Sequence, residues 1–122
     1  MITKLKTVLK PNADVCFAYL FGSYANDAFD ARSDVDIAVY FKNGIDLYDA
    51  GLTLHHSLEK ALRKPVDLIV LNTIRNYDLL NDILNDGKVL IDREPDTRKI
   101  FEVEKEHEIK DFDVFKRMID AA

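Results

Sequence analysis

The chain has 122 residues, of which 48% are hydrophobic, so it can bury one hydrophobic core and is too short for two ordinary domains. Its formal net charge is -5 at pH 7, which argues against a general nucleic-acid binder, because such proteins carry a basic surface that neutralises phosphates. We therefore expect no direct contact with nucleic acid.

Cysteine content and hydropathy indicate the compartment. Cys16 is the only cysteine, which rules out an internal disulfide and favours a reducing compartment, and we interpret its thiol as a small buried hydrophobe. No apolar run approaches the roughly 20 residues that a membrane span needs, and the N-terminus lacks the apolar core of a signal peptide. The chain is accordingly predicted to be cytoplasmic and to make no contact with a membrane.

Hydrophobic periodicity predicts alternating helices and strands up to residue 92. Residues 2–9 have helical spacing, and residues 15–21 are apolar throughout, which is typical of a central strand that is buried on both faces. The later expected elements are a strand at 34–41, a helix at 46–63, a strand at 66–71, a helix at 74–86 and a strand at 88–92. This alternation predicts an α/β (α+β) fold with a central β-sheet flanked by helices.

After Pro95 the chain becomes highly charged before apolar residues return at helical spacing. This C-terminal stripe consists of Ile109, Phe112, Phe115, Met118 and Ile119. The charged residues are typical of a solvated helix surface, whereas the stripe needs a cover. Either it folds back on the domain or a second chain covers it. We predict a helical extension over residues 96–122, which binds a partner in the second case.

A glycine and a serine at the end of the first strand form a candidate binding site. Gly22 allows a backbone conformation or a close approach that a side chain would block, and Ser23 adds a hydroxyl beside exposed backbone N–H groups. Together they could hold a phosphate. Alternatively, they form a strand-to-helix turn with Ser23 as its N-cap.

Three aspartates are the candidates for metal ligands. Asp34 and Asp36 alternate with apolar residues in an expected strand, so their side chains point to the same face, where cations such as Mg2+ would relieve their repulsion. Asp67 lies in the apolar strand 66–71, where an ionised carboxylate is costly unless it is paired or coordinates a metal. Alternatively, Asp67 faces water at a strand edge.

The order and spacing of these residues resemble a known signature. Gly22-Ser23, ten intervening residues, Asp34-x-Asp36, and Asp67 one strand later resemble the motif of the polymerase-β-like nucleotidyltransferase superfamily. The small size and the sequence over residues 22–39 are similar, more narrowly, to the minimal nucleotidyltransferases known as MntA-type antitoxins of HEPN/MNT toxin–antitoxin pairs. The resemblance covers roughly residues 14–71. It implies a central mixed sheet, with residues 1–95 as a minimal nucleotidyltransferase domain and residues 96–122 as its helical extension.

The resemblance also implies roles for these residues. Asp34, Asp36 and Asp67 would hold two Mg2+ ions, and Asp67 could also accept a proton from the nucleophile. Gly22 and Ser23 would bind the β and γ phosphates of ATP. The expected activity is transfer of AMP from ATP to a tyrosine of a cognate HEPN-type ribonuclease toxin, which inactivates it and implies a hetero-oligomer.

Two other functions stay open, and one departure from the family pattern bears on activity. The chain could instead be a non-catalytic antitoxin that neutralises its toxin by direct binding, or a nucleotidyltransferase that acts on a small-molecule hydroxyl. Family members often carry Arg-Gly where this chain has Asn26-Asp27. A cationic phosphate contact and a flexible turn would both be absent here, and Asp27 would add negative charge near the triphosphate.

Overall fold

The computed structural model describes residues 1–30 and 32–121, and it contains a four-stranded mixed β-sheet in the order β3-β2-β1-β4. Strand β1 pairs antiparallel with both β2 and β4, whereas β2 and β3 are parallel. The strands are β1 (Val15–Phe21), β2 (Val35–Phe41), β3 (Val66–Val70) and β4 (Lys88–Asp92). The expected α/β fold with a central mixed sheet is confirmed, and β1 is central and buried along its whole length as predicted.

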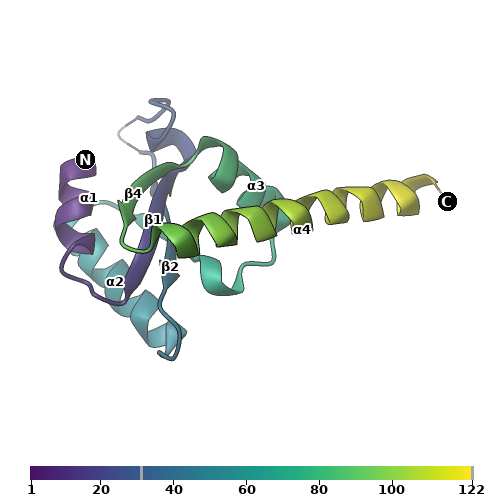
Figure 1. Cartoon of the computed structure of the whole chain (residues 1–122). Helices are drawn as coiled ribbons and strands as arrows, with labels where there is room; N and C mark the ends of the chain where they lie inside the picture. Colours follow the sequence, from purple (N-terminus) through teal and green to yellow (C-terminus); the bar gives the residue numbers. More distant parts are fainter. Residues whose placement is uncertain (31, 122) are drawn as a thin grey trace.

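Helices cover both faces of the sheet (Figure 1). Leucines of α1 and α2 pack with Ile37 and Val39 on one face, and residues of α3 and α4 pack with Phe17 and Ala38 on the other. The helices are α1 (Ile2–Leu9), α2 (Leu47–Leu62), α3 (Tyr77–Asp86) and α4 (Pro95–Ala121). Within residues 1–30 and 32–121, no helix combines the length and the hydropathy that a bilayer-spanning segment needs.

The alternation of β2 places Asp36 on the side of the sheet that faces α3 and α4. Val35, Ile37 and Val39 point into the core beneath α1 and α2, so Asp36 and Ala38 point to the opposite face. Cys16 is 4% exposed, which confirms its interpretation as a buried small side chain. Its neighbour Phe17 contributes to the core between the sheet and α4, where its ring centroid lies 5.6 Å from that of Phe101.

The start of α3 differs from the prediction. The periodicity indicated a helix from residue 74, but the chain first forms a short 3-10 helix at Leu71–Thr73 and then begins α3 at Tyr77. The Asn76 side chain explains this boundary, because its Oδ1 accepts a hydrogen bond from the backbone N–H of Leu79 at 3.1 Å and so caps the helix.

Helix α4 is continuous from Pro95 and extends beyond the domain (Figure 1). Ile109 is 8% exposed and belongs to the core, and the Phe112 ring centroid lies 5.0 Å from that of Tyr77. Phe115 and Ile119, further along the helix, are 57% and 58% exposed. The inner part of the C-terminal stripe therefore folds back on the domain, as the first alternative has it. The outer part is exposed, and its cover by a second chain stays a prediction.

Candidate functional site

Asp36 and Asp67 lie side by side on neighbouring parallel strands. The pairing of β2 with β3 makes Asp36 and Asp67 register partners, so their side chains leave the sheet on the same face. Asp36 is partly buried, whereas Asp67, on the outermost strand, is exposed to solvent. The sequence left open whether Asp67 faces water at a strand edge. It does so, and it also lies beside Asp36.

Gly22 lies directly against the Asp36 side chain. It follows β1, whose last residue, Phe21, is the register partner of Asp36 on β2. The glycine has a φ of +71°, and a Cβ at this position would lie 3.0 Å from Asp36 Cγ and would overlap Oδ2. Only glycine fits both the backbone conformation and the space, which confirms the expected close approach.

A cavity of about 450 Å3 opens above these residues. Of the residues singled out in the sequence, Gly22, Asp36 and Asp67 line it, whereas Ser23 and Asp34 are not among its lining residues. The other lining residues are Phe21, Asn26, Leu79, Asp82 and Asp86.

Sequence reasoning missed the contribution of α3 to this cavity. Asp82 and Asp86 are four residues apart, so they lie on one face of α3, beside the buried Ile83. That spacing was a detectable signal. It could not show that this face points toward Asp36 and Asp67, because the packing of α3 on the sheet depends on contacts distant in sequence.

Asp34 acts on the site through its charge. It precedes β2 and is exposed, two residues from Asp36 and on the same side of the strand. Burial raises the pKa of Asp36 above its ordinary value, and the negative charges of Asp67 and Asp34 raise it further. The two neighbouring carboxylates therefore disfavour the charged form of Asp36.

These carboxylates fit a divalent cation in chemistry and in charge. Hard cations such as Mg2+ prefer carboxylate oxygens, and a cation beside Asp36 would offset the repulsion that raises its pKa. As the side chains stand in residues 1–30 and 32–121, no three His, Cys, Asp or Glu groups are gathered closely enough to hold one ion. The assignment of Asp34, Asp36 and Asp67 as joint metal ligands stays a prediction.

Ser23 lies inside a short 3-10 helix, Gly22–Tyr24, that follows β1. The residue at the N-cap of this turn is Phe21, so the alternative that Ser23 is an N-cap is wrong. The Ser23 carbonyl oxygen instead accepts a hydrogen bond from the Ala28 N–H at 3.0 Å and so closes the turn. Phosphate binding by Ser23 stays a prediction.

The Asn26-Asp27 pair occupies the turn at the edge of the cavity. Asp27 has a φ of 56°, in the left-handed region that favours glycine, so the turn keeps a glycine-like conformation although an aspartate fills it. The neighbouring Asn26 lines the cavity. Its amide is a neutral donor at the place where family members often carry a cation.

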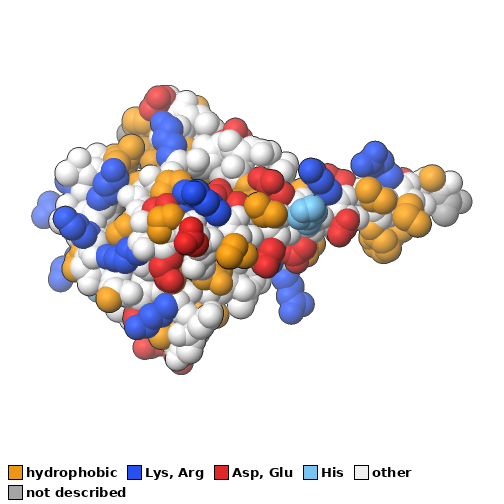
Figure 2. Space-filling model, in the orientation of Figure 1, with side chains coloured by type: hydrophobic (Ala, Val, Ile, Leu, Met, Phe, Trp, Pro, Cys, Tyr) orange, Lys and Arg blue, Asp and Glu red, His pale blue; other side chains and the backbone are white. Residues whose placement is uncertain are grey.

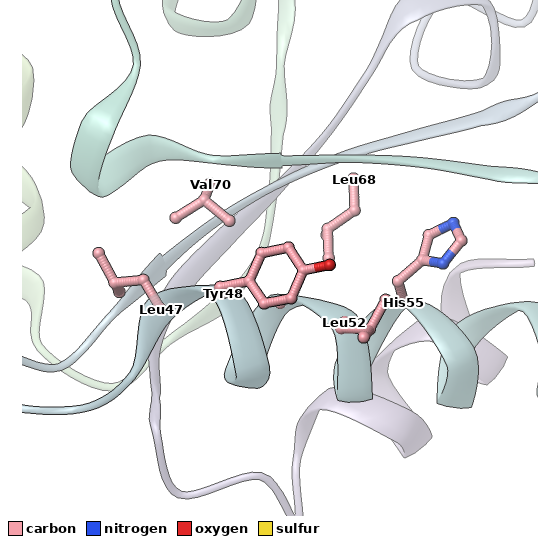
Figure 3. Close-up of a pocket in the computed structure, with 7 residues that line it drawn as sticks. Leu47, Tyr48, Leu52, His55, Leu68 and Val70 are labelled. Carbon is pink, nitrogen blue, oxygen red and sulfur yellow. The ribbon is translucent and has the colours of Figure 1, made fainter.

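A second pocket, of about 240 Å3, lies between α2 and β3 (Figure 3). Most of its lining is apolar, including Leu47, Leu68 and Val70. His55 borders it, but its Nε2 donates a hydrogen bond to the Val66 carbonyl oxygen at 2.8 Å. This pocket brings together no set of groups for group-transfer chemistry, so the cavity around Asp36 is the better candidate.

Comparison with known protein families agrees with the geometry. Residues 3–96 match the family model described as polymerase beta, nucleotidyltransferase. Two proteins of Methanocaldococcus jannaschii are similar to this chain. "Putative protein adenylyltransferase MJ0435" is 43% identical over 71 residues, which are 57% of this chain and 73% of that protein. "Putative protein adenylyltransferase MJ1379" is 39% identical over 77 residues, which are 62% of this chain and 77% of that protein.

Solved structures extend the similarity to nearly the whole chain. A chain of a toxin–antitoxin crystal structure with AMP-PNP has a TM-score of 0.82 and 27% identity, covering 98% of this chain and 95% of that chain. A chain from a complex of tri-AMPylated Shewanella oneidensis HEPN toxin with MNT antitoxin has a TM-score of 0.74 and 25% identity, covering 99% and 97%. The expected polymerase-β-like fold and the resemblance to the MntA group are confirmed.

Proposed function

Because this chain belongs to the polymerase β nucleotidyltransferase family, we propose that it transfers AMP from ATP to a tyrosine of a HEPN-type toxin and so acts as its antitoxin. The observation that carries the proposal is the register pairing of Asp36 with Asp67 beside Gly22, in a cavity of about 450 Å3. The archaeal relatives named as adenylyltransferases support the reaction type. The toxin–antitoxin complexes, one with AMP-PNP and one with an AMPylated toxin, support the nucleotide and the partner.

Different residues of the site would have different roles in the reaction. Asp34, Asp36 and Asp67 would hold Mg2+, which supplies positive charge to the phosphates of ATP and to the developing negative charge of the reaction. The β and γ phosphates would lie against the Gly22 backbone next to Ser23, while the Asp36 carboxylate takes the space that a Cβ on Gly22 would occupy. The tyrosine oxygen attacks the α phosphorus, pyrophosphate leaves, and Asp67 accepts the phenolic proton.

The charge of the cavity favours a cation-dependent reaction. Asp36, Asp67, Asp82 and Asp86 all line it, and ATP is itself strongly negative. Like charges at such short range repel, so the triphosphate can enter only with cations that compensate the carboxylates. Asn26 can then donate its amide hydrogens to a phosphate oxygen, in place of the cationic side chain that is common in the family.

AMP transfer would inactivate a ribonuclease by charge and by bulk. The added phosphate and base next to an RNA-cleaving site repel the RNA backbone and block access to the site. The reaction uses ATP and needs no disulfide, and the single cysteine is buried, which suits the cytoplasm.

A transfer assay with a matched control tests this function. Purified chain and toxin, incubated with Mg2+ and ATP labelled at the α phosphate, should move label to the toxin, and Asp36→Asn or Asp67→Asn should reduce the rate at least a hundredfold. The control is Asp96→Asn, an exposed aspartate in the first turn of α4, which should leave the rate unchanged. ATP with Mg2+ should also raise the Tm of the wild-type protein, since a ligand that binds only the folded state stabilises it.

The second candidate function is neutralisation by binding alone, which the exposed outer part of α4 favours. In that case, Asp36→Asn neutralises the toxin as well as the wild type does, and no label reaches the toxin. Retained neutralisation without transfer would therefore overturn the enzymatic proposal.

A further inference from the structure

Four large apolar side chains are exposed near the free end of α4. We call Val114, Phe115, Met118 and Ile119 the outer stripe; they are 49%, 57%, 66% and 58% exposed. Their spacing places them on one side of the helix. Figure 2 shows hydrophobic side chains gathered at this end of the molecule, beyond a charged stretch of α4.

This end of the helix has little support from its own domain. Its last described contacts with α3 are the packing of the Phe112 ring against Tyr77 and an ion pair in which Lys116 Nζ lies 3.7 Å from Asp78 Oδ1. An isolated helix of about three turns is only marginally stable in water. A surface that covers the outer stripe would therefore stabilise the helix as well as bury apolar area.

Two residues of the outer stripe continue a face that α3 already covers. Phe115 and Ile119 lie one and two turns beyond Phe112, on the same side of α4 as the Phe112 ring that packs against Tyr77. The cover ends where α3 begins, at Tyr77. A partner on the outer stripe would thus lie against the N-terminal end of α3.

Helix α3 connects this position to the catalytic cavity. Its residues Leu79, Asp82 and Asp86 line the cavity, while Tyr77 at its start contacts α4. At 1.5 Å per residue, the path from Tyr77 to Asp86 is about 13 Å. A protein bound to the outer stripe would therefore be separated from the proposed site of AMP transfer by about the length of α3.

We propose that the outer stripe is the docking surface for the protein acceptor, and that it holds an apolar face of the toxin so that the acceptor hydroxyl reaches the cavity along α3. This inference rests on the proposed function for the identity of the acceptor. A second copy of this chain fits less well, since two stripes of four side chains would bury well under the roughly 800 Å2 per partner of a stable interface. The acceptor, in contrast, would add contacts along α3 and the cavity rim.

Steady-state transfer at varied toxin concentration tests the inference in the full-length chain. Phe115→Asp combined with Met118→Asp should raise the KM for toxin at least tenfold and leave kcat at saturating toxin within about twofold, because docking contributes binding and the cavity is untouched. The matched control is Ile100→Asp, 59% exposed at the base of the same helix, which should leave KM unchanged. Met118→Asp alone provides a milder variant if the double variant unfolds.

Separate readouts distinguish failure of this inference from failure of the proposed function. If the wild type transfers no AMP, the toxin Kd measured by calorimetry still tests docking, and it should weaken at least tenfold in the double variant. An unchanged KM or Kd in the variants overturns the inference. So does a wild-type dimer that dissociates in the double variant while toxin affinity stays the same, because the outer stripe would then bind a second copy.

Discussion

The Asp36 carboxylate fills the space that a Cβ on Gly22 would occupy. This contact joins the end of β1 to the start of β2 and fixes the depth at which Asp36 enters the cavity. Asp67 is the register partner of Asp36, so the pairing of β2 with β3 places the second acidic group beside the first. The absence of a side chain at Gly22 therefore makes room for one of the proposed metal ligands.

Gly22→Ala should damage both the fold and the reaction. A left-handed backbone costs an L-residue about 1–2 kcal/mol, and overlap with a neighbouring group costs about 1–3 kcal/mol more, so we expect the free energy of unfolding to fall by about 2–5 kcal/mol. Gly44→Ala is the matched control, since Gly44 has a φ of +82° but no atom within 4 Å of the position that an alanine Cβ would take. Urea unfolding should show a loss of only about 1 kcal/mol for Gly44→Ala, with AMP transfer retained. Equal losses in the two variants would contradict the close contact.

Asp36→Asn should stabilise the protein at neutral pH while it abolishes transfer. Partial burial and the charges of Asp67 and Asp34 raise the pKa of Asp36, so the folded state holds this proton more tightly than the unfolded chain does. The free energy of unfolding therefore falls as the pH rises from the ordinary value of 3.8 through the raised pKa, and ionised Asp36 is unfavourable above it. The variant has no such charge and should melt a few degrees higher at pH 7.

Melting curves across pH check this sign. The advantage of Asp36→Asn over the wild type should shrink as the pH is lowered toward 4, where the wild-type carboxyl group becomes protonated. Asp67→Asn serves as a second variant, because it removes the neighbouring charge and should lower the pKa of Asp36. A variant that melts below the wild type at pH 7 would show that the Asp36 charge is compensated in the metal-free protein.

The strands and the first helix could be predicted because their patterns are local. Residues 15–21 are apolar throughout and β1 spans them, and the expected helix at 2–9 has the same limits as α1. The boundary of α3 was misplaced by three residues because the capping side chain of Asn76 decides it, whereas the apolar spacing alone extends back to Ile74. Local patterns thus identify an element more reliably than its first residue.

Only part of the candidate site could be predicted, because the cavity is built from elements that are distant in sequence. The Gly22 motif and the aspartates Asp36 and Asp67 follow a recognisable spacing, and the structure brings them together. The contributions of Asp82 and Asp86 depend on how α3 packs on the sheet, which no local pattern reports. The outer stripe was also only partly predictable. The spacing of its apolar residues indicates a helix face, but it does not show where the packing of α3 against that face ends.

Arg93 should be a main support of the N-terminal helix. Its guanidinium donates hydrogen bonds to the carbonyl oxygens of Asn12 and Val15, both at 2.8 Å, and also to those of Leu9 and Lys10 at the end of α1. A planar group with five N–H donors can serve several carbonyls at once, whereas a lysine ammonium cannot reach them together. We expect Arg93→Lys to lower the free energy of unfolding by about 1–3 kcal/mol, measured by urea unfolding. Lys99→Arg, an exposed site on α4, is the control, and a loss no larger than its own would contradict this role.

Asp82 and Asp86 should weaken ATP binding when Mg2+ is scarce. They add two negative charges to a cavity that already contains Asp36 and Asp67. In a water-like environment, a negative charge about 8 Å from a phosphate makes the binding free energy about 0.5 kcal/mol less favourable. Asp82→Asn combined with Asp86→Asn should therefore lower the Kd for ATP by about fivefold at low Mg2+ and low salt.

The difference should diminish at saturating Mg2+ and at high ionic strength, where the charges are compensated or screened. Calorimetric titration of ATP at two Mg2+ concentrations measures both effects. Asp78→Asn is the matched control, because Asp78 is an exposed aspartate of the same helix that pairs with Lys116 outside the cavity. If the double variant binds ATP more weakly than the wild type at low Mg2+, the two carboxylates take part in holding the cation, and their role is attraction of Mg2+ and not repulsion of the nucleotide.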